Sequence, residues 1–170
     1  MPVIPQRSDA ADDKFLFDQG PARGLSGIRF PDYHPVFERS HLPNVAVFVR
    51  QIEAFRDLLA AAPPDEAKSR DTDLLLAVGE LFTLVVYAQL LLENAEIHGT
   101  EPDLVDQMFD VIVRDFSEFA VQLHGKASVT PEQAKRCLAM IQRPVVDDDR
   151  FRRVWRDHVH ALRDAYEMNP

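Results

Sequence analysis

The sequence predicts an all-α fold, an antiparallel bundle of four to five helices with an extended, aromatic-rich N-terminal arm. Three observations lead to this prediction. Residues 74–92 read LLLAVGELFTLVVYAQLLL and are apolar on nearly every side of a helix. Segments on both sides of this stretch repeat apolar residues at three- and four-residue spacing, which is typical of amphipathic helices. No segment shows the sustained alternation with turn pairs that is typical of strands.

The apolar stretch at 74–92 is expected to be the central helix. A helix that is apolar all round must be covered by other elements or by lipid. A membrane span needs about 20 apolar residues and few charges, but Glu80 lies inside this run. A carboxylate at the centre of a membrane costs about 2.5–3.5 kcal/mol, and the flanks lack the basic bias that orients a span. We therefore predict a buried bundle helix, with a transmembrane helix as the alternative.

Length and composition indicate one globular domain and narrow the possible partners. The chain has 170 residues, 46% of them hydrophobic, and only six glycines. Its formal net charge of −9 argues against nucleic acid as a partner, because binding a duplex requires lysines and arginines at the phosphates. One cysteine excludes an intrachain disulfide and fits a reducing compartment. With no apolar segment behind a basic start, a cytoplasmic protein is expected.

The chain divides into three predicted regions. Residues 1–14 are polar and are interpreted as a disordered leader or a cut edge. Residues 15–43 combine many aromatic residues with prolines and glycines, which prevent a long helix. This composition favours an extended arm or linker whose rings fill pockets on another surface. Residues 44–170 form the helical bundle.

The first two bundle helices have recognisable ends. The first is expected to begin at Asn44 as N-cap and to run to about residue 62, since Pro63 and Pro64 follow. The second is expected over 65–98, with Gly99 in the C′ position, and a break near residue 70 is the alternative.

The next two helices also carry start and stop signals. Thr100 is expected to cap the third, with Pro102 in its first turn, and Gly125 to end it. The fourth is short and begins with the capping box Thr130-Pro131-Glu132-Gln133.

Asp147 is expected to cap a last helix. Three successive aspartates, 147–149, suggest a cation site, but negative charge is also favoured at a helix start, and capping is the preferred interpretation. The apolar face expected for this helix comprises Phe151, Val154, Trp155, Val159, Leu162 and Tyr166.

Two residues are candidates for ligand contact. Glu80 is expected to be buried, and a buried carboxyl either finds a partner or becomes neutral. It is therefore a candidate ligand or proton site, or a satisfied polar contact with another helix. Arg23 lies in the turn-rich sequence GPARG at 20–24, which can offer backbone amides and a guanidinium to a phosphate or carboxylate.

No catalytic residue or metal site is predicted. His158 and His160 are two residues apart, which places them about 200° apart on a helix. Glu93, Glu96 and His98 lack the Glu-x-x-His spacing of di-iron bundles. Cys137 has no histidine placed to activate it.

Several stretches resemble the extreme C-terminal region of long bacterial acyl-CoA dehydrogenases of the actinobacterial fatty-acid-oxidation type. They occur in the family's order and cover almost everything after about residue 13. The matching stretches are FLFDQGPARGL from Phe15, LPNVA from Leu42, GELFTLVVYAQLLLENAE from Gly79, DQMFDVIVRDFSEFAVQLHGKA from Asp106, RPVVDDDRFRRVW from Arg143, and the final AYEMNP.

The resemblance implies an all-helical extension placed after a catalytic core. In that family the core holds FAD and a glutamate that abstracts the α-proton of the acyl-CoA, and the flavin accepts hydride from the β-carbon. This sequence has no stretch that matches the flavin site or the base, so it carries no implied catalytic residue, and FAD is implied only for the missing core. The chain is then an excised piece, a split-gene subunit or a remnant.

The leading hypothesis is a helical accessory or assembly domain of an acyl-CoA dehydrogenase, not catalytic alone. Its expected partner is the dehydrogenase core, in the same or a separate chain, or a second copy of itself. The alternative is a free-standing bundle that binds an acyl chain or acyl-CoA between its helices, with Arg23 or another exposed arginine near the anionic end.

Overall fold

The computed structural model describes residues 32–61 and 71–165, and within these ranges every regular element is a helix. The chain divides into units 1–32 and 33–170, and the description below concerns the second. Its helices are α2 (His34–Glu38), α3 (Pro43–Ala61), α4 (Thr72–His98), α5 (Pro102–His124), α6 (Pro131–Ala139) and α7 (Asp148–Val154). A π-helical turn, η3 (Trp155–Val159), and a 3-10 turn, η4 (His160–Leu162), follow α7. The all-α prediction is confirmed.

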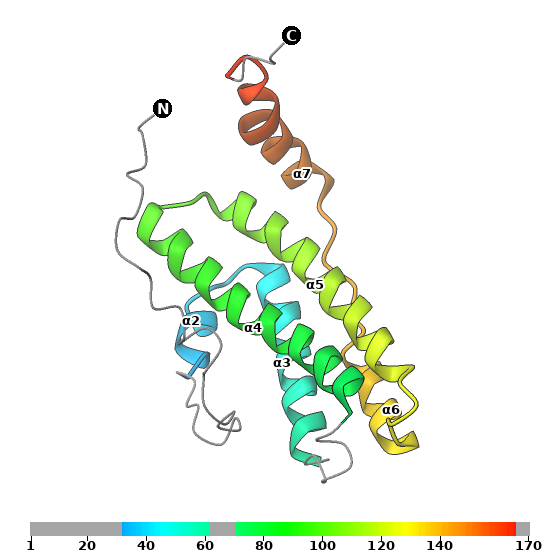
Figure 1. Ribbon diagram of the computed structural model, residues 1–170. Helices are drawn as coiled ribbons and strands as arrows, with labels where there is room; N and C mark the ends of the chain where they lie inside the picture. Colours follow the sequence, from blue (N-terminus) through cyan, green and yellow to red (C-terminus); the bar gives the residue numbers. More distant parts are fainter. Residues whose placement is uncertain (1–31, 62–70, 166–170) are drawn as a thin grey trace, which may run out of the picture. The chain divides into compact units, whose positions relative to one another are not determined.

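The central helix is α5, not α4. α5 packs against α3, α4, α6 and α7, whereas α4 packs mainly against α5 and α2. α4 and α5 form an antiparallel hairpin, and α3 crosses beneath it (Figure 1). The prediction of a central α4 is wrong, because it rested on the hydrophobicity of the helix, and a hydrophobic helix is not always buried within its own chain. Only one narrow stripe of α4 is buried, formed by Ala77, Leu81, Ala88 and Leu92.

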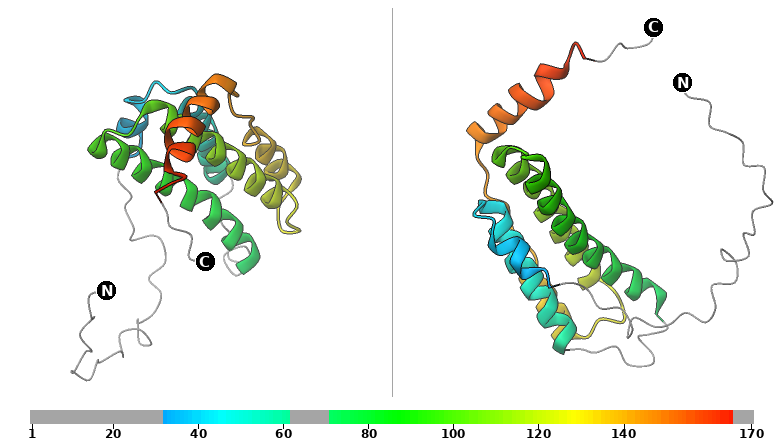
Figure 2. Two further views of the ribbon diagram at one scale, coloured as in Figure 1. Left: turned by 90° about the horizontal axis from the view of Figure 1, so that it is seen from above. Right: turned by 90° about the vertical axis from the view of Figure 1, so that its left-hand side faces the viewer.

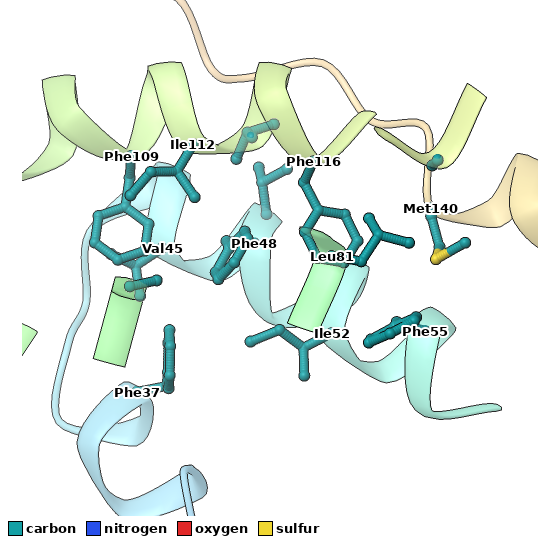
Figure 3. Close-up of a cluster of buried hydrophobic side chains, with 14 of the residues drawn as sticks. Phe37, Val45, Phe48, Ile52, Phe55, Leu81, Phe109, Ile112, Phe116 and Met140 are labelled. Atoms are coloured by element: carbon teal, nitrogen blue, oxygen red, sulfur yellow. The ribbon is translucent and has the colours of Figure 1, made fainter. Parts of the chain in front are cut away.

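The core lies between α3 and α5 and is built around phenylalanines (Figure 3). Phe48 contacts Phe116 and Phe109 edge to face, at ring-centroid distances of 5.4 and 5.7 Å. Phe55 meets Phe116 in the same way at 6.0 Å. Such edge-to-face pairs contribute about 0.5–1.5 kcal/mol each beyond the area that they bury. The helical phase of α3 and α5 is therefore set by interlocking rings.

Helix ends follow the local sequence with two exceptions. Gly99 adopts the left-handed conformation predicted for it, with φ 62°, and the full capping box forms at Thr130. The N-cap of α5 is Glu101, whose side chain makes no capping hydrogen bond, so the prediction of Thr100 as cap is wrong. α3 begins at Pro43, and the side chain of Asn44 is used for a tertiary contact described below. The start of the second helix predicted at residue 65 lies outside the described residues, and α4 begins after Asp71.

Part of the predicted extended arm belongs to the bundle. Residues 34–38 form α2, because Pro35 is tolerated in the first turn of a helix. Phe37 on α2 is buried and lies 6.1 Å from Phe48 and 6.5 Å from Phe109 between ring centroids. The leader 1–14 and the rest of the arm up to residue 31 lie outside the described residues.

Candidate functional site

The outward side of α4 is an exposed apolar surface. Leu76, Leu90 and Ile97 are 65, 56 and 77% exposed, and Leu75 and Tyr87 are exposed beside them. Leu76, Thr83, Leu90 and Ile97 recur every seven residues, so they form one line along the helix. A Cβ added at Gly79, on the same side, would meet nothing within 4 Å. We call these residues, 75, 76, 79, 83, 87, 90 and 97, the outer face of α4.

Glu80 lies at one edge of the outer face and is exposed to solvent. The expectation of a buried Glu80 is therefore wrong, because α4 turns only its opposite side toward α5. Glu93 lies at the other edge, about 140° from Glu80 around the helix, and accepts a hydrogen bond from Gln89 at 2.9 Å. α4 contains four carboxylates, those of residues 73, 80, 93 and 96, and no lysine or arginine. Asp73 and Glu96 pair with Lys126 and Arg39, so Glu80 and Glu93 are the carboxylates that make the edges of the apolar outer face acidic.

By length and composition alone, α4 is long and apolar enough to cross a membrane, and it is the one such helix among the described residues. Only 22% of its most apolar stretch is buried. A contiguous exposed apolar surface that is rimmed by polar residues marks a site for a protein partner or a membrane.

A second exposed apolar surface lies on residues 148–165, which we call the C-terminal segment. Phe151, Trp155, Val159 and Leu162 are all exposed, Phe151 by 54% and Trp155 by 53%. The segment extends beyond the end of the α4–α5 hairpin (Figures 1 and 2). Of the apolar face predicted for the last helix, only Val154 is buried, and Tyr166 lies outside the described residues.

Exposed arginines follow this apolar stripe along one side. Arg152, Arg156 and Arg163 come directly after Phe151, Trp155 and Leu162 in sequence, so they share one edge of the stripe. Each arginine pairs with an exposed aspartate close by in sequence: Arg152 with Asp149, Arg156 with Asp157 and Arg163 with Asp164. Exposed pairs of this kind contribute little. The guanidinium groups can therefore exchange these aspartates for other carboxylates.

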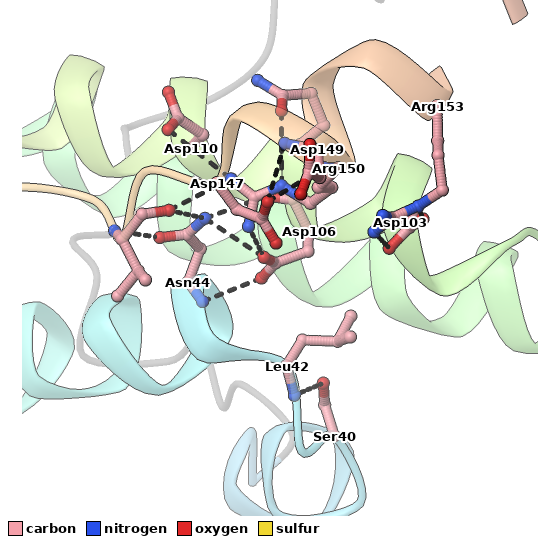
Figure 4. Close-up of polar contacts among 12 residues, drawn as sticks. Ser40, Leu42, Asn44, Asp103, Asp106, Asp110, Asp147, Asp149, Arg150 and Arg153 are labelled. Atoms are coloured by element: carbon pink, nitrogen blue, oxygen red, sulfur yellow. Dashed lines mark hydrogen bonds and ion pairs between the residues drawn. The ribbon is translucent and has the colours of Figure 1, made fainter. Parts of the chain in front are cut away.

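A buried polar junction fastens the C-terminal segment to the bundle (Figure 4). Arg150 on α7 forms an ion pair with Asp106 on α5, and their side chains are only 5 and 3% exposed. Arg150 also donates to the carbonyl of Val145 at 3.1 Å. Asn44 on α3 completes the junction: its backbone N–H donates to Asp106 at 2.8 Å, and its side-chain oxygen accepts from the N–H of Val145 at 2.7 Å.

Burial dominates the electrostatics of this junction. Burial raises the pKa of the Asp106 carboxyl, while the hydrogen bond from Asn44 and the charge of Arg150 act in the opposite direction. At the exposed rim the balance is reversed. The hydrogen bond from Arg153, at 2.5 Å, lowers the pKa of Asp103. Hydrogen bonds from the backbone N–H groups of Arg150 and Asp149 lower the pKa of Asp147, which caps α7 as predicted.

A second buried polar contact fixes the chain that leads to this junction. The side-chain amide of Gln51 on α3 lies 2.9 Å from the carbonyl of Met140 and 3.0 Å from the hydroxyl of Ser117. Ser117 also accepts from the N–H of Gln142 at 3.0 Å and donates to its carbonyl at 2.8 Å. These contacts hold residues 140–145 against α3 and α5 without regular secondary structure.

Within the described part of the chain, the remaining candidates from the sequence form no site with one another. Arg23 lies outside the described residues. Cys137 is fully buried, and burial raises the pKa of its thiol, which leaves it in the unreactive protonated form. His158 on η3 lies 3.1 Å from Glu101, the N-cap of α5, in a solvent-accessible pair. Among residues 32–61 and 71–165, no group of three or more His, Cys, Asp or Glu side chains is placed to hold a metal ion.

The sequence analysis did not predict the two buried polar contacts, those of Asp106 and of Gln51. Asp106 and Gln51 both fall in phase with the apolar stripes of their helices, and this position indicates a buried polar group. The seven-residue repeat of the outer face is equally visible in the sequence.

Comparison with protein-family models, with curated proteins and with solved structures found no match.

Proposed function

We propose that this chain is a helical assembly domain of a flavin-dependent acyl-CoA dehydrogenase of fatty-acid β-oxidation, without catalytic activity of its own. The single observation that carries an assembly role is the outer face of α4, which presents exposed leucine, isoleucine and tyrosine side chains along a whole helix. The dehydrogenase assignment is supported by the resemblance of the sequence to the C-terminal region of that family.

The alternative of a free-standing bundle that binds an acyl chain between its helices has less support. It rests on the excess of Leu, Val and Phe on α4 and α5. The phenylalanines at 109 and 116 are fully buried in ring contacts of the core, and the apolar residues of the outer face point away from the bundle. Both sets of residues therefore have a role that requires no acyl chain.

A protein partner also fits the outer face better than lipid does. Glu80 and Glu93 border the face on both sides, and each carboxylate placed in hydrocarbon costs several kcal/mol or must be neutralised. In a protein interface the same carboxylates can lie at the polar rim, opposite arginine or lysine side chains.

The experiment is a gentle affinity purification of the tagged full chain from a bacterial host that carries out fatty-acid β-oxidation. The visible spectrum and the protein content of the eluate are recorded. Leu90→Lys places a charge in the outer face, and Leu138→Lys is the matched control, because Leu138 is 54% exposed on α6, outside that face.

We expect a yellow eluate that contains a flavin-dependent dehydrogenase chain, with the flavin lost in Leu90→Lys and kept in Leu138→Lys. A colourless eluate that contains only the folded chain would overturn the proposal. Titration of that chain with a fluorescent fatty-acyl probe would then test the free-standing acyl binder, which requires saturable binding.

A further inference from the structure

We infer that the outer face of α4 binds the C-terminal segment of a second copy of this chain, and that two copies exchange these segments reciprocally. This inference rests on the proposed assembly role: the paired copies, rather than the outer face itself, recover the dehydrogenase core, so Leu90→Lys loses the flavin by separating the copies. Each copy offers both an acceptor, the outer face of α4, and a donor, residues 148–165. A reciprocal exchange uses every such surface in a closed two-fold dimer and leaves none exposed.

The two surfaces match in shape and chemistry. Both are single helical stripes of exposed apolar side chains, and an amphipathic helix that docks along a second apolar surface is a common mode of recognition. Trp155 and Phe151 are large rings on the donor, and aromatic residues dominate the binding energy of most interfaces. The open position at Gly79 on the acceptor leaves space for such a ring beside Leu76 and Thr83.

Charge selects this pairing over the others. The acceptor is bordered by Glu80 and Glu93 and has no cation on its helix, whereas the donor has Arg152, Arg156 and Arg163 along one edge. Pairing α4 with a second α4 would bring like-charged carboxylates together, and like charges across an interface oppose association. In a pairing of two C-terminal segments, the arginines would meet only one another and the aspartates that already pair with them, so that pairing gains no additional carboxylate.

The donor is also placed to reach another molecule. Its first turn is anchored by the buried Arg150, and the stripe that follows extends beyond the hairpin of α4 and α5 (Figure 1). η3 and η4 have their main contacts with α7 and with each other. The first turn of the segment is therefore fixed to the bundle, and the apolar side chains that follow it are exposed to solvent.

The test uses two full-length variants that each block one surface. Leu90→Lys blocks the acceptor and leaves the donor intact; Phe151→Glu blocks the donor and leaves the acceptor intact. Leu138→Lys and Val121→Glu are controls at similarly exposed sites on α6 and α5. Molar mass is measured over a concentration series by light scattering and sedimentation. Trp155, the chain's one tryptophan, reports burial through its emission wavelength.

We expect the unmodified chain and both controls to dimerise, with a blue shift of Trp155 emission as concentration rises. Each blocking variant alone should associate about tenfold or more weakly. An equimolar mixture of the two should form a heterodimer, because the donor of Leu90→Lys still fits the acceptor of Phe151→Glu. Added salt should weaken the dimer, since exposed arginine–carboxylate contacts are screened.

Three results would overturn the inference. If Phe151→Glu alone dimerises normally, α4 pairs with α4; if Leu90→Lys alone does, the C-terminal segments pair with each other. If the unmodified chain is monomeric at every concentration, and particularly if it then sediments with phospholipid vesicles, the outer face serves something other than a second copy. The assembly role is judged separately, since a monomeric chain that still recovers a flavin-dependent dehydrogenase would bind the core directly.

Discussion

Replacement of Arg150 by methionine should be among the most damaging single changes in this protein. Methionine retains much of the apolar stem of arginine and removes the guanidinium. The Asp106 carboxylate would then be buried with Asn44 as its remaining donor, through contacts of 2.8 Å from the backbone N–H and 3.3 Å from the side-chain amide. Breaking one partner of a buried ion pair costs about 3–5 kcal/mol, because the other charge is left uncompensated. A typical domain has only about 5–15 kcal/mol of stability.

The cause of this loss can be separated from simple loss of packing. Asp106→Asn removes the charge but keeps a side-chain oxygen that can accept from the N–H of Asn44. In the Arg150→Met background, this second change should restore most of the lost stability, since the uncompensated charge at residue 106 is gone and the buried Asp110 keeps its ion pair with Arg114 at 2.7 Å. Arg152→Met is the matched control: its pair with Asp149 is exposed on both sides, and its free energy of unfolding should not change measurably.

Urea unfolding followed by far-ultraviolet circular dichroism gives the free energies, and a constant dependence on urea concentration checks that the unfolded states are comparable. The reasoning fails if Arg150→Met costs less than about 1 kcal/mol, the value expected of an exposed pair. It also fails if Asp106→Asn makes Arg150→Met worse rather than better.

Four further predictions concern the core, the outer face, acid stability and the buried thiol. Phe116→Ala should cost about 3–5 kcal/mol in urea unfolding, because it empties the site where two other rings meet. In the Leu90→Lys background, where the outer face is unoccupied, Gly79→Ala should raise the melting temperature and stabilise the chain by about 0.5–1 kcal/mol, as the added methyl meets nothing and alanine favours a helix. The pKa of Asp147 is lowered in the folded protein, so its stabilising contribution is present above the ordinary aspartate pKa of about 3.9 and is lost as pH falls below it. Trp155 emission should therefore change in acid. The change should be smaller in Asp147→Asn, because asparagine caps a helix without titrating. Cys137 should react with a thiol reagent slowly in the native protein and quickly in urea; rapid native reaction would contradict its burial.

Much of the fold could be predicted from the sequence because local signals decide the helix ends. The left-handed glycine at 99, the capping box at Thr130 and the aspartate cap at 147 each depend on residues within one turn. Apart from the cap of α5, which lies at Glu101 instead of Thr100, the failures arise from tertiary contacts. Asparagine is favoured at helix N-caps, but the side chain of Asn44 accepts a hydrogen bond from the backbone N–H of Val145, 101 residues away.

Hydrophobicity alone misplaced α4 and, with it, Glu80. An apolar helix can be covered within its own chain or by a partner, and composition is the same in both cases. The distinction lies in which residues repeat: small alanines alternate with leucines on the side toward α5, whereas Leu76, Leu90 and Ile97 repeat on the opposite side. Arg23 lies outside the described residues.

The junction of Asn44, Asp106 and Arg150 also sets an order on folding during synthesis. Helices α3 to α5 leave the ribosome before residues 140–150, and they then contain Gln51 and Asp106 in otherwise apolar surroundings, without two of their later partners, Met140 and Arg150. Unpaired buried polar groups are costly, so the hairpin and α3 remain loosely joined until the later segment arrives. The stretch without regular structure at 140–147 thus completes the contacts that join α3 to the α4–α5 hairpin. Nascent chains halted before residue 140 should be digested by protease more readily than chains that include residue 150.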